Sequence, residues 1–124
     1  MLGKRVMLVD DDQDFLLVTS TLLRRSGYEV LFATDAVPAI SVAVKQNPQA
    51  VVLDIGLPGG DGTTVMKHLH AMPQLAGIPV LILSGRDPAA YREAVLKAGA
   101  VAYLTKPVDA EELVAALRLA LNPA

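Results

Sequence analysis

The sequence predicts an α/β fold of one domain, residues 1–124, in which five parallel strands alternate with five helices in a doubly wound (βα)5 sandwich. Two observations lead to this prediction. Residues 6–9, 50–53 and 79–83 are almost continuously apolar, which is typical of strands that are buried on both faces of a parallel sheet. Helical segments with recognisable boundary residues lie between the runs, so strands and helices alternate along the chain.

The first helix is expected over residues 14–26, directly after the first strand. Its apolar residues Phe15, Val18 and Leu22 recur at helical spacing and lie on one side of the helix. Gly27 provides the stop, because glycine readily adopts the left-handed conformation that ends many helices. This segment therefore covers one face of the sheet.

Two strands are expected at the edges of the sheet, at residues 28–32 and 101–104, because these runs are shorter or more mixed in polarity. A second helix over residues 35–46 has Pro38 near its start, where proline is tolerated, and ends at an Asn-Pro pair. A third helix, residues 62–71, is inferred from its position between a Gly-Gly pair and a proline.

The last two helices have the clearest boundaries. An Asp-Pro pair opens the helix over residues 87–98, which closes at Gly99. The helix over residues 109–121 begins with Asp109 and Glu112 at the spacing of a capping box. Its apolar face comprises Leu113, Ala116, Leu117, Ala120 and Leu121.

Composition excludes several classes of protein. Apolar residues make up 52% of the chain and charged residues 19%, so a packed core is expected. The net charge of −2, with scattered lysines and arginines, argues against direct nucleic-acid binding, and the lack of cysteine excludes disulfides and fits a cytoplasmic protein. The N-terminal apolar run is too short for a signal peptide or membrane span. His68 and His70 are interpreted as exposed helix residues because their spacing makes a poor metal pair.

Reactive side chains follow four of the five predicted strands. Because the carboxyl ends of parallel strands meet at one edge of the sheet, these side chains are expected to lie together. Closely spaced carboxylates repel one another unless a cation lies among them, and Mg²⁺ is held by one or two carboxylates with waters and phosphate oxygens. The expected site is therefore a Mg²⁺ site that also accepts an anion. Its residues are Asp10, Asp11, Asp54, Ser84 and Lys106.

The chain resembles the receiver domain of response regulators in bacterial two-component signalling, including the chemotaxis receivers, over essentially its whole length. The resemblance is carried by the motifs LVDDD, LDIGLPGGDG, LILSG and KAGAVAYLTKPVDAEEL, in this order and at these strand ends. Each motif is weak alone, but together they are highly specific. The resemblance implies a flavodoxin-like fold with the strand order 2-1-3-4-5.

The resemblance also implies a role for each acidic residue. Asp54 matches the phospho-accepting nucleophile and, with Asp10 and Asp11, the Mg²⁺ site. Asp11 matches the direct metal ligand and Asp10 acts through water, while the backbone carbonyl of Gly56 supplies another metal oxygen. Asp12, with Asp14, is interpreted as a helix-start residue that complements the helix dipole.

Three further residues take their roles from the same resemblance. Ser84 matches the hydroxyl that hydrogen-bonds the phosphoryl group, and Lys106 matches the lysine that pairs with it. Tyr103 matches the aromatic switch residue, which can rotate into the space that Ser84 vacates. The family places a cis peptide bond at Lys106–Pro107, which aims the lysine inward.

The function implied by the resemblance is phosphorelay signal transduction. A sensor histidine kinase or a phosphotransfer protein supplies the phosphoryl group, and the domain catalyses only its own phosphorylation and dephosphorylation. The fourth helix, fifth strand and fifth helix form the surface for a downstream output protein or domain, and a homodimer can form there. This output surface is expected to carry Tyr91, Arg92, Val95, Tyr103 and the exposed side of the last helix.

Three other interpretations were weighed. A mononucleotide binder of the same architecture needs a phosphate loop after the first strand, where the sequence DDDQD repels phosphate. A Mg²⁺-dependent phosphohydrolase with an aspartyl nucleophile needs a second acid two residues later, where Gly56 stands. A receiver-like interaction module that is never phosphorylated is disfavoured by the intact set of site residues, and the sequence leaves it open.

Overall fold

The central sheet has the predicted topology. The computed structural model describes residues 4–56, 62–85 and 88–122. Within these ranges five strands, all parallel to their neighbours, form one sheet in the order β2-β1-β3-β4-β5. The fold class and strand order are thus confirmed, and each strand lies within one residue of its expected position. The strands are β1 Arg5–Val9, β2 Glu29–Ala33, β3 Ala50–Asp54, β4 Val80–Ser84 and β5 Ala102–Thr105.

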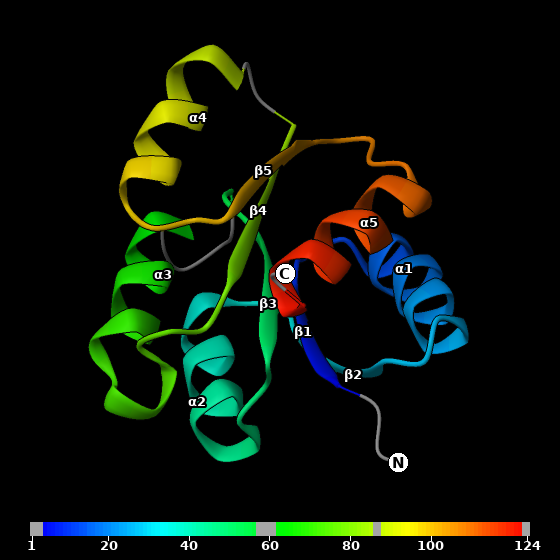
Figure 1. The fold of residues 1–124 in the computed structure, drawn as a ribbon, viewed down its shortest axis with the longest axis horizontal. Helices are drawn as coiled ribbons and strands as arrows, with labels where there is room; N and C mark the ends of the chain where they lie inside the picture. Colours follow the sequence, from blue (N-terminus) through cyan, green and yellow to red (C-terminus); the bar gives the residue numbers. More distant parts are fainter. Residues whose placement is uncertain (1–3, 57–61, 86–87, 123–124) are drawn as a thin grey trace.

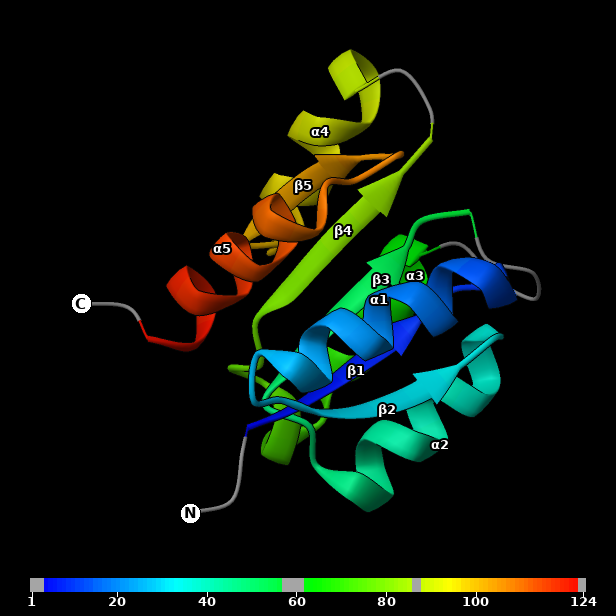
Figure 2. The ribbon, with the colours of Figure 1, turned by 90° about the vertical axis from the view of Figure 1, so that its right-hand side faces the viewer.

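The helices cover the two faces of the sheet unequally. In Figure 1, α1 and α5 lie to the right of the sheet and α2, α3 and α4 to the left, and Figure 2 shows α1 and α5 together on one face. A short 3-10 helix, η1 (Pro73–Leu75), was not predicted and begins at a proline. Across the described ranges, no helix has the length and apolar character needed to cross a membrane. The helices are α1 Gln13–Arg25, α2 Ala36–Gln46, α3 Gly62–Ala71, α4 Pro88–Lys97 and α5 Ala110–Leu121.

Alternation along the central strands divides the core into two halves. Met7 and Val9 point to the side of α2, α3 and α4, whereas Val6 and Leu8 point to the side of α1 and α5. β3 and β4 continue both rows, and all four of these β1 side chains are at most 1% exposed. Both faces of the inner strands therefore need apolar residues, which explains the continuous apolar runs in the sequence.

The first helix contacts the sheet through a different set of residues from the one that the sequence indicated. Leu16 and Leu23 are buried with the sheet residues, but Val18 is 60% exposed. Val18 instead lines a groove of about 490 Å³ between α1 and α5, together with Phe15 and Leu22. The predicted stripe therefore lines the groove between α1 and α5, and the buried residues of α1 are Leu16, Thr19, Ser20 and Leu23.

The helix boundaries follow the capping rules. The Asp12 side chain caps α1 by accepting a hydrogen bond from the Phe15 backbone N–H at 3.1 Å. Asp109 caps α5, but its carboxylate accepts from Glu111 N–H at 3.2 Å rather than from the expected third position. Gly27 and Gly99 follow α1 and α4 with φ angles of +96° and +113°, as the left-handed helix stop requires.

His70 is not the exposed residue that the sequence suggested. Its Nε2 lies 3.0 Å from the carbonyl oxygen of Ile78, and its ring lies near Gly99. His70 is partly buried, whereas His68 is exposed as expected. The reason is the turn after α3, which brings Ile78 back alongside the last turn of the helix.

Three glycines allow the backbone and packing effects to be separated. Gly99→Ala is expected to lower the free energy of unfolding by roughly 2 kcal/mol or more, because an added Cβ would be strained at φ +113° and would lie 3.4 Å from the His70 ring. Gly27→Ala has the strain without the contact, so a loss of about 1 kcal/mol is expected. Gly77→Ala has neither and should be close to neutral. Urea denaturation of the three variants tests this order, and equal losses at all three positions would contradict it.

Candidate functional site

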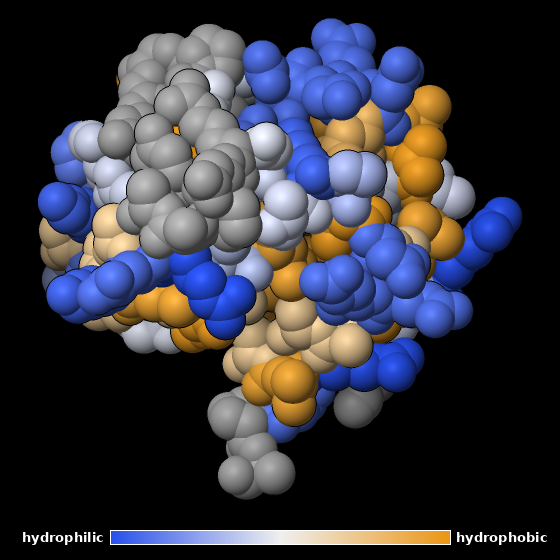
Figure 3. Space-filling view, turned by 90° about the horizontal axis from the view of Figure 1, so that it is seen from above, coloured by the Kyte–Doolittle hydropathy of each residue, from blue (hydrophilic) through white to orange (hydrophobic). Residues whose placement is uncertain are grey.

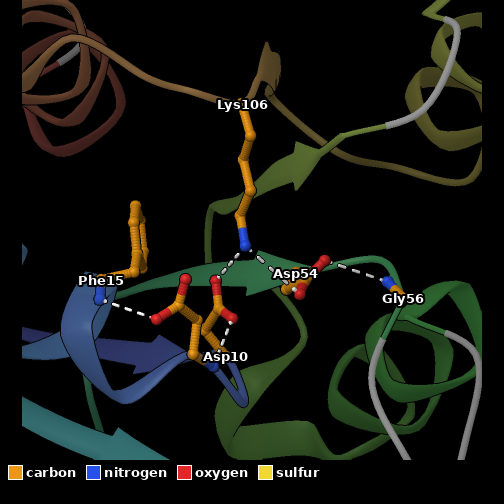
Figure 4. A network of polar contacts seen from close by, with 6 residues as sticks. Asp10, Phe15, Asp54, Gly56 and Lys106 are labelled. Carbon is orange, nitrogen blue, oxygen red and sulfur yellow. Dashed lines mark hydrogen bonds and ion pairs between the residues drawn. The ribbon is translucent and has the colours of Figure 1, made fainter.

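The predicted acidic residues and the lysine meet at the carboxyl ends of the strands. Asp10 follows β1, Asp54 ends β3 and Lys106 follows β5. The Lys106 ammonium lies 2.5 Å from Asp10 Oδ2 and 3.4 Å from Asp54 Oδ2 (Figure 4). The Lys106–Pro107 peptide bond is cis, as the resemblance implied. The parallel sheet thus brings together charges that are 96 and 52 residues apart in the sequence.

Asp10 is held as a buried carboxylate. Its residue is 1% exposed, and its second oxygen, Oδ1, accepts a hydrogen bond from the Asp12 backbone N–H at 3.0 Å. The Asp10 backbone N–H donates to the carbonyl oxygen of Ala33 on β2 at 3.1 Å. Burial of an ionised carboxylate is unfavourable without such partners. Both carboxylate oxygens of Asp10 therefore have a donor.

Three carboxylates form a cluster that can hold a metal ion. One oxygen from each of Asp10, Asp11 and Asp54 lies within 4.8 Å of the others. Asp10 is buried, Asp54 is partly buried and Asp11 is exposed, so the cluster opens toward solvent on one side. Gly56 lies beside it, and its N–H donates to Asp54 Oδ1 at 3.0 Å. An all-oxygen donor set of this kind fits a hard divalent cation such as Mg²⁺.

The pKa directions show how strongly the lysine is coupled to the cluster. Burial raises the pKa of Asp10, and the hydrogen bond from Lys106 opposes this rise. For Lys106, burial alone would lower the pKa, but the hydrogen bond to Asp10 and the charges of Asp10 and Asp54 outweigh it and raise the pKa. The lysine therefore stays positively charged, as a cation beside developing negative charge must.

Ser84 and Tyr103 lie on the other face of the sheet. Ser84 ends β4, is fully buried and follows the row of Val80 and Ile82, which faces α2, α3 and α4. Tyr103 lies opposite Ile82 in the register of β4 and β5 and packs in the same half of the core. The Ser84 carbonyl oxygen accepts a hydrogen bond from Lys106 N–H at 2.8 Å. This backbone contact joins the ends of β4 and β5.

The structure buries two of the four residues that were named for the expected output surface. Tyr103 is 7% exposed and Val95 is fully buried, so neither forms part of the surface. Arg92 is exposed as expected, and the side chain of Tyr91 lies outside the described part of the chain. β5 is a short strand at the edge of the sheet, and Tyr103 packs with Val95 in the half of the core under α2, α3 and α4. Exposed apolar residues here are Leu96 on α4, Val101 just before β5, and Leu119 on the exposed side of α5.

The end of the molecule that carries the site has both hydrophilic and hydrophobic surface. Figure 3 views this end from above and shows that many of the described residues exposed there are hydrophilic. Orange hydrophobic surface lies at the right, on the side of α1, where Leu17 and Val18 are 66% and 60% exposed.

Comparison with known proteins assigns the family. Residues 6–118 match the model of the response regulator receiver domain. The chain therefore belongs to this family and is a receiver domain of two-component response regulators. It is similar to the transcriptional regulatory protein PrrA of Mycobacterium tuberculosis, with 44% identity over 95% of the chain and 50% of PrrA. The chain thus spans about half the length of the curated relatives it matches.

Solved structures give the same result. A putative response regulator from Chloroflexus aurantiacus J-10-fl is 33% identical with a TM-score of 0.91, covering 96% of this chain and 98% of that one. The receiver domain of the sensor histidine kinase PA1611 from Pseudomonas aeruginosa PAO1 is 29% identical with a TM-score of 0.87, covering 96% and 98%. The PA1611 structure has a magnesium ion coordinated in its active site cleft.

Removal of the lysine charge should give a pH-dependent loss of stability. The raised pKa of Lys106 means that its charge stabilises the fold fully below its ordinary pKa of 10.5 and loses this effect as the pH rises through the higher folded value. Lys106→Met is expected to lower the free energy of unfolding by about 1–3 kcal/mol at pH 8. Urea denaturation from pH 8 to 12 should show this difference shrinking. A constant difference would contradict the coupling, and Lys97→Met, in an exposed pair with Glu93, is the control.

The buried hydroxyl of Tyr103 should contribute nothing favourable to stability in this conformation. Within the described part of the chain it has no hydrogen-bond partner. Tyr103→Phe is therefore expected to leave the free energy of unfolding unchanged or to raise it by roughly 1 kcal/mol, because an unsatisfied buried hydroxyl is removed. Thermal and urea denaturation measure the change, with Tyr28→Phe as the control on the other face. A clear loss at Tyr103 would show that the hydroxyl has a partner.

Proposed function

We propose that this domain receives a phosphoryl group on Asp54 from the phosphohistidine of a sensor histidine kinase or phosphotransfer protein. The observation that carries the proposal is the Lys106 ammonium between Asp10 and Asp54, with Asp11 in the same cluster. Two anions react poorly unless their charge is neutralised and their positions are fixed. The cluster supplies the metal ligands and the lysine supplies the remaining cation.

In the proposed step, an oxygen of Asp54 attacks phosphorus and the bond between phosphorus and the donor imidazole nitrogen breaks. The imidazole leaves with the electron pair and takes up a proton, and Asp54 becomes an acyl phosphate. Asp11 and Asp54 would hold Mg²⁺ with the Gly56 carbonyl, and Asp10 would act through water. When bound, Mg²⁺ would neutralise charge on the phosphoryl oxygens. Lys106 pairs with a phosphoryl oxygen.

The proposed signal follows from the change at Asp54. A phosphoryl group there adds negative charge and acceptor oxygens at the edge of the sheet. Ser84 would move toward the new acceptors, and Tyr103, already buried on the same face, would stabilise the resulting packing. This shifts an existing equilibrium rather than building a new fold. The readout surface is α4, β5 and α5, where Leu96 on α4, Val101 just before β5 and Leu119 on α5 offer apolar contacts to an output partner or a second copy.

Several parts of the proposal concern the whole protein. We assign residues 1–124 to one receiver domain that acts in the cytoplasm and catalyses only its own phosphorylation and dephosphorylation. The net charge of −2 supports the absence of direct nucleic-acid binding by this domain. Any DNA contact would then belong to an output domain or partner.

Intact-protein mass spectrometry tests the chemistry. Incubation with acetyl phosphate and Mg²⁺ is expected to add one phosphoryl group, and removal of Mg²⁺ with a chelator should abolish the adduct. Asp54→Asn should prevent it, because the amide cannot act as the nucleophile. Asp14→Asn is the matched control, since Asp14 is an exposed residue in the first turn of α1.

Two results would contradict the proposal. An adduct that persists in Asp54→Asn would place the reaction on another residue. No adduct with either acetyl phosphate or a phosphorylated histidine kinase, despite measurable Mg²⁺ binding, would favour the phosphorylation-independent interaction module.

A further inference from the structure

We infer that Phe15 is a positioning residue for Lys106. The Lys106 Nζ lies 4.9 Å from the centroid of the Phe15 ring, within the range of a cation–π contact. Figure 4 shows the ring on the α1 side of the lysine and Asp54 on the other. The ammonium therefore has a carboxylate pair below it and an aromatic ring beside it. The consequence for phosphorylation rests on the proposed function, whereas the contact itself does not.

The contact with Phe15 restrains the Lys106 side chain in a way that the carboxylates alone do not. A lysine side chain has four rotatable bonds, and that of Lys106 is 23% exposed, so it can swing into solvent. Asp10 and Asp54 hold it at rest, but a divalent cation in the cluster would compete for the same oxygens. The ring is no ligand for such a cation. It can hold the ammonium near Asp54 while the carboxylates change partners.

A contact with an aromatic face also leaves the N–H donors of the lysine available for other partners. An ammonium has three N–H donors, and a carboxylate partner uses at least one of them. The ring attracts the charge as a whole through its quadrupole and does not require a directed hydrogen bond. Phe15 can therefore fix the position of Lys106 while its donors remain available for phosphoryl oxygens.

The position of the ring is fixed by the start of α1. The Phe15 backbone N–H donates to Asp12 Oδ1 at 3.1 Å, and Leu16 N–H donates to Asp12 O at 3.0 Å. The Phe15 side chain is partly buried against the half of the core under α1 and α5. The cap and the packing together hold the ring beside the lysine. Asp12, which was predicted only as a helix-start residue, thus supports the site indirectly by capping the helix at Phe15.

The chain contains a matched control for this contact. Arg24 lies 5.5 Å from the centroid of Phe32, which is on β2 and is 40% exposed. This pair is also a cation–π contact, but neither residue belongs to the acidic cluster. The same substitution at Phe32 therefore removes an equivalent contact away from the site.

The test compares Phe15→Leu, Phe15→Tyr and Phe32→Leu in the full chain. The first readout is the NMR signal of the Lys106 ε-methylene in ¹³C-lysine-labelled protein, assigned with Lys106→Arg. Ring current should shift this signal upfield in the wild type, and Phe15→Leu should remove the shift. Phe15→Tyr should retain it, and Phe32→Leu should leave it unchanged.

The second readout is the rate of phosphorylation by acetyl phosphate at saturating Mg²⁺. Phe15→Leu is expected to slow it about three- to tenfold, the range for loss of one cation–π contact. Phe15→Tyr should recover most of the rate, since the aromatic face is restored. Phe32→Leu should react like the wild type, as a general effect of losing an aromatic residue would be seen there too.

The two readouts separate this inference from the proposed function. An unshifted Lys106 signal in the wild type, or one that Phe15→Leu does not move, would overturn the contact. A lost shift with an unchanged rate would overturn the positioning role. If the wild type itself accepts no phosphoryl group, the proposed function fails, and with it the role of Phe15 in phosphorylation.

Discussion

The rest of the site depends on one interaction, the ion pair between Lys106 and the buried carboxylate of Asp10. The two residues directly follow strands β1 and β5, which are separated by β3 and β4 in the sheet. The lysine must therefore reach back over the ends of two strands, and its charge makes the burial of Asp10 tolerable. The parallel order of the strands makes this contact possible, because it places the carboxyl ends of all five strands at the same edge of the sheet.

The site is divided between the two faces of the sheet. Asp10 and Phe15 lie toward α1 and α5, whereas Ser84 and Tyr103 lie toward α2, α3 and α4. Asp54 ends β3, which is paired with both β1 and β4. A change of charge on Asp54 therefore occurs beside the strand that leads to Asp10 on one side and beside the strand that ends in Ser84 on the other. The position of Asp54, the proposed nucleophile, in the sheet order would connect the proposed chemistry to the packing that reports it.

The strands were predictable from sequence because burial on both faces of the sheet requires continuous apolar runs. The clustering of the charged residues that follow those runs was predictable because the carboxyl ends of parallel strands lie at one edge. Side-chain orientation was harder. Val95 and Tyr103 read as surface residues because a helix or edge strand has a buried and an exposed side that local sequence does not distinguish. His70 was misjudged, and the contact of Phe15 with Lys106 was not predicted, because the contacts of both residues form only after distant segments fold together. No local pattern signals either contact.

The unequal distances from Lys106 to its two carboxylates suit the proposed chemistry. A lysine bound equally to both would neutralise the nucleophile as much as its neighbour and would hinder its attack. Here the 2.5 Å contact goes to the buried Asp10, and the 3.4 Å contact to the more exposed Asp54. Asp10 thus anchors the cation, while Asp54, whose side chain is 13% exposed against 1% for Asp10, is less closely paired with it and would remain the better nucleophile in the proposed step. The buried carboxylate is therefore as necessary as the reactive one, since it determines where the positive charge lies before the phosphoryl group arrives.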